Sequence, residues 1–268
     1  MKSRSSFMTP FAGAVLFFAG AVLPSAMAQA QDMMRNVDLS TPMFTNADMT
    51  REEVEAAAKA AKGAPADLSG KSLNGLDLSG LDLRGVNFRA ARMNKTKLAG
   101  AKLDGAVLDQ VWAVAADFSG ASLKKAGLFA SQMQDAKFDG ADLSGARITA
   151  DFSRASMKNA KFRDADLAAD MKNQSMGLMR AVLKSADLTG ADFEGANLAQ
   201  TDLQFAKLSG ANLANASLSR AEAGGADFRG ARLAHTDFSD ADVTSARLDA
   251  AQEAAFAGAK NLSRAIKE

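Results

Sequence analysis

The stretch SADLTGADFEGANLAQTDLQFAKLSGANLANASLSR, residues 185–220, repeats a pattern of five residues. This period differs from the 3.6 residues of a helix and from the two residues of a strand. Each unit has one large apolar residue, and a small residue, usually alanine, stands two positions before it. Because side chains two apart on an extended segment point the same way, both face inward and the polar residue between them faces outward. The other two residues turn the chain, which predicts a narrow coil of short strands and corners.

The five-residue units run from residue 66 to residue 250, and their thirty-seven central apolar residues extend from Leu68 to Leu248. Units such as ADLSG, ADFEG, GANLA and AKLSG resemble the pentapeptide repeat family, whose pattern is A(D/N)LXX. The resemblance implies an all-β fold, a right-handed quadrilateral parallel β-helix with four units per coil. It further implies about nine coils, each of which buries its apolar face on its neighbours. Short helical caps are expected at the two ends, where strand edges are otherwise unpaired.

Residues 1–28 have the three-part pattern of a secretory signal peptide. Lys2 and Arg4 precede the apolar run FAGAVLFFAGAVL, and small residues then lead to a cleavage position after Ala28 or Ala30. Because a membrane-spanning helix needs about 20 apolar residues, this run is too short to serve as a permanent anchor. The sequence therefore predicts a periplasmic or secreted protein with no stable membrane insertion after signal cleavage.

The N-terminal segment, residues 29–65, contains one predicted helix directly before the repeats. Thr50 and Glu53 have the spacing of a capping box, which begins a helix. Gly63 stands where a helix commonly ends, and Pro65 prevents its continuation. We expect this helix to cover the open end of the coil.

The C-terminal segment, residues 251–268, abandons the repeat and is predicted to form a helical cap. Asp249 and Gln252 have capping-box spacing. Leu262 and Ile266, four residues apart, would give this helix an apolar face.

The five-residue spacing changes in one place, between Ile148 and Leu183. Met171 and Met176 fit the pattern there as central residues, and the original phase returns afterwards. The stretch ADMKNQSMGLMR, residues 169–180, lies where the phase is restored. A bulge or a short corner loop absorbs such a slip, whereas a protruding loop would act in recognition. Both interpretations fit the sequence.

Composition and residue placement argue against nucleic-acid binding and catalysis. The chain has 32 Lys plus Arg against 31 Asp plus Glu, and so lacks the basic stripe of a nucleic-acid-binding protein. His235, the single histidine, falls at an outward corner, whereas catalysis requires groups that converge in a concave site. Outward aspartates are interpreted as solubilising groups, among them Asp67, Asp77, Asp187 and Asp192. We therefore predict no catalytic residue, no cofactor and no metal ligand.

Methionine residues gather in two places and give an alternative function. The first group comprises Met33, Met34, Met43 and Met49, and the second comprises Met171, Met176 and Met179. Thioether groups of an exported protein can bind Cu(I), so a periplasmic Cu(I)-binding protein is one alternative. Methionine also fills irregular core space, and no histidine or cysteine joins either group.

The strongest surface anomaly lies in VLDQVWAV, residues 107–114. Val107 and Trp112 occupy outward positions that are usually polar. Val114 follows Trp112, and Phe129 lies one coil above the corner beside Val107. Exposed aromatic and aliphatic side chains mark protein-contact patches, so these four residues form the candidate site. Arg92, one coil before Trp112, is an alternative cover for the indole ring.

The leading interpretation is a non-enzymatic exported solenoid, a structural scaffold or protein-binding module with an unknown protein partner. The resemblance offers a second function, because some family members protect DNA gyrase by imitating DNA. Those members are cytoplasmic and acidic, whereas this chain has a signal-peptide pattern and nearly balanced charge. A shared fold does not decide between such functions.

Overall fold

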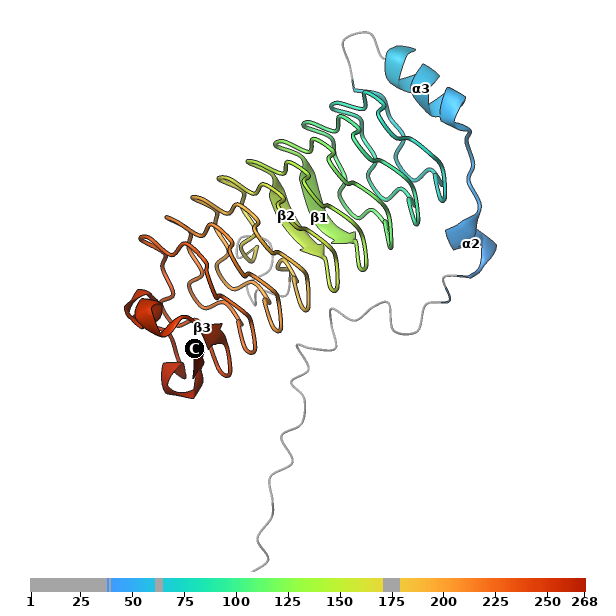
Figure 1. The fold of residues 1–268 in the computed structure, drawn as a ribbon. Helices are drawn as coiled ribbons and strands as arrows, with labels where there is room; N and C mark the ends of the chain where they lie inside the picture. The colour runs from blue at the N-terminus through green and yellow to red at the C-terminus, as the bar shows by residue number, and fades with distance from the viewer. Residues whose placement is uncertain (1–37, 39, 61–64, 171–178) are drawn as a thin grey trace, which may run out of the picture.

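The computed structural model describes residues 38, 40–60, 65–170 and 179–268. The repeats form a rod of stacked coils, with the N-terminal helices at one end and the C-terminus at the other (Figure 1). Outward residues of successive coils pair in parallel, in a series that begins with Asp67 and Asn87. These partners are twenty residues apart and each side takes five residues, so every regular coil has four sides.

The four sides of the rod are named faces A to D after the outward residues that pair along them. Face A carries Asp67, Asn87, Val107, Gly127, Arg147, Asp166, Asn197, Ser217 and Asp237. Face B carries Ser72, Arg92, Trp112, Gln132, Asp151, Val182, Asp202, Glu222, Asp242 and Lys260. Face C carries Asp77, Lys97, Asp117, Lys137, Ser156, Asp187, Lys207, Asp227, Arg247 and Ile266. Face D carries Asp82, Lys102, Ser122, Asp142, Lys161, Asp192, Asn212 and Arg232. The residue two positions after an outward residue lies at the corner that leads to the next face.

The inward positions build the core, as the repeat predicts. Ala191 and Phe193 are both completely buried, and the rings of Phe162 and Phe193 stack 4.6 Å apart on successive coils. Each buried Leu or Phe contributes about 1.5–3 kcal/mol before conformational entropy is subtracted. Alanine occupies most of the other inward positions, because two large side chains on every side would overfill a tube this narrow. The first coil departs from this rule, since Leu81 and Leu83 are both buried on one side.

Each corner is a tight turn in which glycine is favoured. At the first corner the amide of Lys71 donates to the carbonyl oxygen of Leu68 at 3.3 Å, and Gly70 has a φ of +67°. Glycine adopts this left-handed conformation without a steric penalty. Phe205 takes a φ of +58° at an equivalent turn position, and its ring lies 2.6 Å from where a Cβ on Gly225 would be placed. Gly225 is therefore favoured by its turn and required by the neighbouring ring.

The change of spacing begins where the strands are longest. β1 (Gly127–Gln132) and β2 (Arg147–Asp151) pair in parallel, with a register shift between Phe129 and Gln132. Gly127 pairs with Arg147, twenty residues on, but Gln132 pairs with Asp151, nineteen residues on. One residue is thus missing from the turn between faces A and B at that level.

The following coil is lengthened at one corner. Arg147 pairs with Asp166, and Asp151 pairs with Val182. The step from residue 166 to residue 182 therefore spans sixteen positions, where the regular repeat has five. The slip is taken up between faces A and B. The interpretation of residues 171 and 176 as central residues lies outside the described residues.

The predicted capping box is present at the start of α3 (Arg51–Ala60). The amide of Thr50 donates to Glu53 Oε2 at 2.8 Å, and the amide of Glu53 donates to Thr50 Oγ1 at 3.3 Å. Val54 on this helix is completely buried in the hydrophobic core of the rod. The helix thus covers the N-terminal end of the core. Gly63, its predicted end, lies outside the described residues.

A second short helix, α2 (Pro42–Thr45), precedes α3 and lies beside the first coils (Figure 1). Between the two helices, Ala47 pairs in antiparallel fashion with Leu73. The predicted signal peptide, residues 1–28, lies outside the described residues. Among the helices that the structure does describe, none is long and apolar enough to cross a membrane.

A helix does begin after Asp249, as predicted for the C-terminal cap, but it is a 3₁₀ helix and lacks the predicted capping box. Residues Ala250–Phe256 form a 3₁₀ helix, η1, and Asp249 makes no side-chain cap. The Asp249 carboxylate instead accepts a hydrogen bond from the amide of Gly230 at 2.8 Å, because that amide lies at the end of the regular coils. Phe256 is completely buried, and its ring lies 4.3 Å from that of Phe238. The segment still closes the core, with an aromatic plug in place of an amphipathic helix.

The chain then returns to the coil. After η2 (Leu262–Arg264), strand β4 (Ile266–Lys267) pairs in parallel with β3 (Arg247–Leu248). Leu262 packs against the core, but Ile266 is 49% exposed. The predicted apolar face made by these two residues is therefore absent, because Ile266 takes an outward position on face C.

Candidate functional site

The structure distributes the four predicted patch residues over two faces. Val107 is outward on face A, and Trp112 is outward on face B. Phe129 lies near the corner between these faces, where its amide donates to Asp109 Oδ1 at 3.1 Å. Val114 lies at the far corner of face B. All four are half-buried. Val107, Phe129 and Trp112 surround the edge between faces A and B, whereas Val114 lies at the opposite edge of face B.

Trp112 has an aromatic partner that the sequence analysis missed. The ring of Phe44, on α2, lies 5.1 Å from the indole ring, centroid to centroid, at an interplanar angle of 35°. Arg92 is the neighbour of Trp112 on face B, as the repeat predicts, but Phe44 contacts the ring. Residues 42–48 thus form a strap that crosses face B, and Trp112 is its aromatic contact.

Two buried polar side chains on the first coil hold the strap by its backbone. Asn74 Nδ2 donates to the carbonyl oxygens of Met43 and Asn46, at 3.2 and 3.1 Å. Ser72 Oγ donates to the carbonyl oxygen of Asn46 as well. Ser72 and Asn74 are only 2% and 4% exposed. These hydrogen bonds are made to backbone carbonyl groups, so they do not depend on the side chains of the strap.

A carboxylate completes the contact between the strap and face B. Asp48 Oδ2 accepts a hydrogen bond from the amide of Ser72 at 2.9 Å, and the amide of Asp48 donates to the carbonyl oxygen of Ser72 at 2.7 Å. The same carboxylate lies 3.7 Å from the guanidinium of Arg92. This is an ion pair beyond hydrogen-bond length, and Arg92 Nε is buried without a hydrogen-bond partner.

The corner beyond face B carries a column of amide side chains. Asn74 Oδ1 accepts from the amide of Asn94 at 2.9 Å, and Asn94 Oδ1 accepts from the amide of Val114 at 3.0 Å. Two coils further, Gln134 Nε2 donates to Gln132 and Asp151, at 2.9 and 2.8 Å. The opposite ends of two of these amides, Asn94 Nδ2 and Gln134 Oε1, are buried without a partner.

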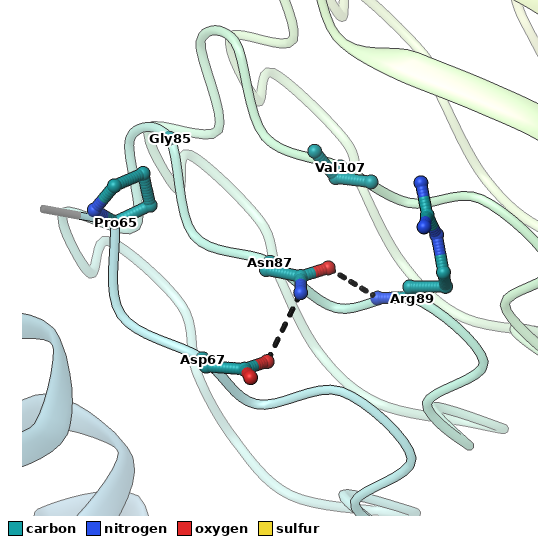
Figure 2. Close-up of a pocket in the computed structure, with 6 residues that line it drawn as sticks. All are labelled: Pro65, Asp67, Gly85, Asn87, Arg89 and Val107. Atoms are coloured by element: carbon teal, nitrogen blue, oxygen red, sulfur yellow. Dashed lines mark hydrogen bonds between the residues drawn. The ribbon is translucent and has the colours of Figure 1, made fainter.

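On face A the sequence leaves an open depression around Val107. It is lined by Pro65, Asp67, Gly85, Asn87, Arg89 and Val107 (Figure 2). Asn87 bridges the floor, because its Nδ2 donates to Asp67 Oδ1 and its Oδ1 accepts from the amide of Arg89, both at 3.0 Å. The polar groups of this depression are thus largely satisfied by one another.

The outward aspartates have a structural function that the sequence analysis missed. Asp67, Asp77, Asp187 and Asp192 each accept a hydrogen bond from the amide two residues later, at 3.0 to 3.2 Å. This arrangement holds the turn at the corner. Side-chain hydrogen bonds from Arg229 lower the pKa of Asp227 in the same position to about 2. These carboxylates act as turn formers, and His235 is exposed at a corner, as expected.

Faces C and D carry charges that alternate in sign along the rod. Face C begins with Asp77, Lys97, Asp117 and Lys137. Lys97 lies 3.9 Å from Asp77, and Lys207 lies 3.8 Å from Asp187. Such pairs are exposed and contribute little stability, but they cancel the field of the face.

The later part of face B carries an acidic run that is partly neutralised. Arg180 donates to both carboxylate oxygens of Glu222, at 2.7 and 3.1 Å. Asp202 precedes Glu222 on face B, and burial raises the pKa of its carboxyl. Arg180 therefore ties the chain that follows residue 178 to face B.

The described methionines do not form a ligand set. Met43 is 61% exposed, and Met49 packs against the core. Met179 is half-buried. Met33, Met34, Met171 and Met176 lie outside the described residues.

These features define the protein as a four-sided parallel solenoid with a capped core. The family model for pentapeptide repeats matches it in eight copies, over residues 72–110, 114–145, 131–168, 178–213 and 211–249. The chain therefore belongs to the pentapeptide repeat family, whose members fold as right-handed quadrilateral β-helices and are generally non-enzymatic.

Solved structures of the same family resemble the chain. HetL, which is involved in heterocyst differentiation regulation in the cyanobacterium Nostoc sp. strain PCC 7120, is 25% identical, with 82% of this chain and 94% of HetL covered and a TM-score of 0.33. QnrB1, a plasmid-mediated fluoroquinolone resistance protein, is 18% identical, with coverages of 66% and 84% and a TM-score of 0.47. A thylakoid-lumen protein of Arabidopsis thaliana is 31% identical over 45% of this chain and 72% of its own, with a TM-score of 0.23.

No curated protein sequence matches the chain significantly. The TM-scores of the three structures are all below 0.5, so the functions of these proteins carry no argument for this one.

Proposed function

We propose that this protein is a non-enzymatic exported rod that binds another protein, as a structural scaffold or a protein-binding module. The observation that carries the proposal is the departure of face B from the repeat at Trp112. A regular rod needs only polar outward residues there. Face B instead carries the indole ring of Trp112, which the strap covers. Beside it, the buried side chains of Ser72 and Asn74 donate hydrogen bonds to the backbone carbonyl groups of the strap.

The charge pattern favours a protein partner over imitation of DNA. A surface that imitates DNA needs like charges in sequence, whereas the outward charges of faces C and D alternate between carboxylates and cations. Charges of opposite sign on neighbouring coils cancel at a distance. The nearly balanced composition agrees with this, since 32 basic residues face 31 acidic ones.

Export is part of the proposal and rests on the signal-peptide pattern of residues 1–28. The N-terminus of protein isolated from the native host should begin at Gln29 or Gln31. Full-length chain recovered from the cytoplasm would overturn the export part of the proposal.

A photo-crosslinking comparison tests the binding part. A photoreactive phenylalanine replaces Gln132 on face B in one variant and Lys137 on face C, on the same coil, in the other. In intact cells we expect a discrete protein adduct from position 132 and none from position 137. Equal adducts at both positions, or none at either, would contradict a binding surface on face B.

A further inference from the structure

The buried polar atoms that lack partners are concentrated around Trp112. In the described part of the chain, three buried side-chain atoms have no hydrogen-bond partner: Arg92 Nε, Asn94 Nδ2 and Gln134 Oε1. All three belong to face B or to its corner toward face C, on the coils directly below and above Trp112. A polar group that is buried without a hydrogen-bond partner destabilises the fold. Their gathering at one place points to a ligand that pairs with them.

The strap shows which chemistry these groups accept. Asn74 and Asn94 occupy the same corner on successive coils, and each uses its Oδ1 to accept the amide of the next coil. Both amides are thereby oriented alike along the column. Asn74 Nδ2 donates to two peptide carbonyls of the strap, whereas Asn94 Nδ2 donates to none. A peptide carbonyl is therefore the matching group for Asn94 as well.

Arg92 requires an acidic group that the strap supplies incompletely. The Asp48 carboxylate binds the amide of Ser72 at 2.9 Å and remains 3.7 Å from the guanidinium. A glutamate at this position extends one methylene further, so its carboxylate can reach hydrogen-bond distance. Charged hydrogen bonds of arginine to carboxylate are about twice as strong as neutral ones.

We infer that face B from Ser72 to Gln134 is a binding site for a peptide segment of the partner protein, and that the strap is its internal occupant. The segment has an aromatic residue that packs on Trp112 and, four residues later, an acidic residue that binds Arg92. This spacing is that of Phe44 and Asp48 in the strap. The intervening carbonyl groups bind the column of amide side chains. The inference rests on the proposed protein-binding function and names the chemistry of the partner.

Competition between strap and partner follows from this arrangement. The partner segment displaces the strap, since both use Trp112. The strap is covalently attached and so acts at a high effective concentration. Only molecules with an undocked strap can bind the partner, so the apparent affinity is the intrinsic affinity multiplied by the undocked fraction. A weakened strap therefore increases partner binding.

The test uses the full chain and a fluorescein-labelled decapeptide with the sequence of residues 41–50 and the substitution Asp48→Glu. Fluorescence anisotropy measures its binding to the wild type and to the Phe44→Ala/Asp48→Ala double variant, in which the strap is weakened. We expect saturable binding to the double variant, and at least tenfold weaker binding to the wild type. A peptide in which Phe44→Ala is also made should lose at least tenfold in affinity.

Variants of the site separate recognition from folding. Arg92→Met or Trp112→Ser, added to the double variant, should weaken peptide binding at least tenfold. Arg89→Met, on the face A corner of the same coil, should leave it unchanged, and circular dichroism verifies the fold of each variant. Absence of saturable binding to the double variant, or binding indifferent to both site substitutions, would overturn the inference.

A last measurement is the oligomeric state of the double variant without peptide. A monomer by light scattering is expected. A dimer that the peptide fails to dissociate would overturn the assignment to a foreign segment, because a second copy of the chain would then cover the site. Crosslinking at residue 132 in cells tests the protein-binding function separately, and it still succeeds if the partner binds face B through other chemistry.

Discussion

The contact between Phe44 and Trp112 leads to a prediction that can be measured without any ligand. Trp112 is the single tryptophan and the chain has no tyrosine, so the intrinsic fluorescence of the protein reports on this ring alone. Phe44→Ala removes the aromatic cover of the indole ring. We expect the emission maximum of Trp112 to move to longer wavelength and its quenching by acrylamide to increase.

The magnitude follows from the geometry. An aromatic pair at this separation contributes about 0.5–1.5 kcal/mol beyond its buried area. Phe44 is half-buried, so removal of its ring forfeits about half of the 1.5–3 kcal/mol of full burial. Together these give about 2 kcal/mol against strap docking, which is about thirtyfold in the docking equilibrium. Ser72 and Asn74 still hold the backbone of the strap, so displacement should be partial.

Phe205→Ala removes a 60% exposed ring on a distant coil and should leave Trp112 emission unchanged. Thermal unfolding followed by circular dichroism should change little for Phe44→Ala, because the core of the rod is untouched. Identical emission and quenching in the wild type and the Phe44→Ala variant would refute the strap contact.

Three further predictions concern the rod. Ala191→Leu should lower the free energy of unfolding by about 1–3 kcal/mol through overpacking, whereas Ala234→Leu at an exposed corner should have little effect; equal denaturation midpoints would contradict the inward assignment. Gly225→Ala should lower the free energy of unfolding more than Gly210→Ala. Both positions have a φ near +70°, which costs about 1–2 kcal/mol for alanine, but only the new methyl group at position 225 meets the Phe205 ring. The pKa of Asp227 is lowered to about 2 in the folded state, so its stabilisation, about 1–2 kcal/mol, is present above pH 4 and lost as pH falls toward 2. Urea titrations of the wild type and Asp227→Asn should converge over that range.

The repeat is what made the core predictable. Inward and outward positions alternate along each side, so one correct assignment, such as Ala191 inward and Asp192 outward, extends to every coil. The capping box at Thr50 was predictable for a related reason, because it depends on residues three apart and on local geometry alone. Both predictions use interactions that are short in sequence or periodic.

The C-terminal helix was predicted in the right place, but its capping box is absent because a tertiary contact takes the Asp249 side chain. Asp249 has the sequence context of a helix cap, but the amide of Gly230 at the end of the coils takes its carboxylate. Phe256 is drawn into the core by the rings of Phe228 and Phe238, at 5.5 and 4.3 Å. Burial of an aromatic ring outweighs the small α-helix preference of a few exposed residues, and the segment forms a 3₁₀ helix.

The strap was beyond prediction for a different reason. It joins residue 44 to residue 112, and neither periodicity nor spacing links a non-repetitive segment to one position of a rod. The sequence does show both halves of the contact: Trp112 is an aromatic residue at an outward position, and Phe44 is an aromatic residue outside the repeats. Each lacks an explanation within its own segment, which is a reason to pair them.

The pentad pattern also explains where a function can be located in such a rod. A repeat that satisfies its own backbone and core leaves the outward and corner positions free to vary without loss of stability. At the corner beyond face B, the residues at the same position on successive first coils are Asn74, Asn94, Val114 and Gln134. Among the described residues, the buried amide side chains are those of Asn74, Asn94 and Gln134, all in this column. Burial of amides with free ends opposes stability. Their presence beside Trp112 agrees with the proposed peptide site on this stretch of face B, because packing of the rod alone does not require them.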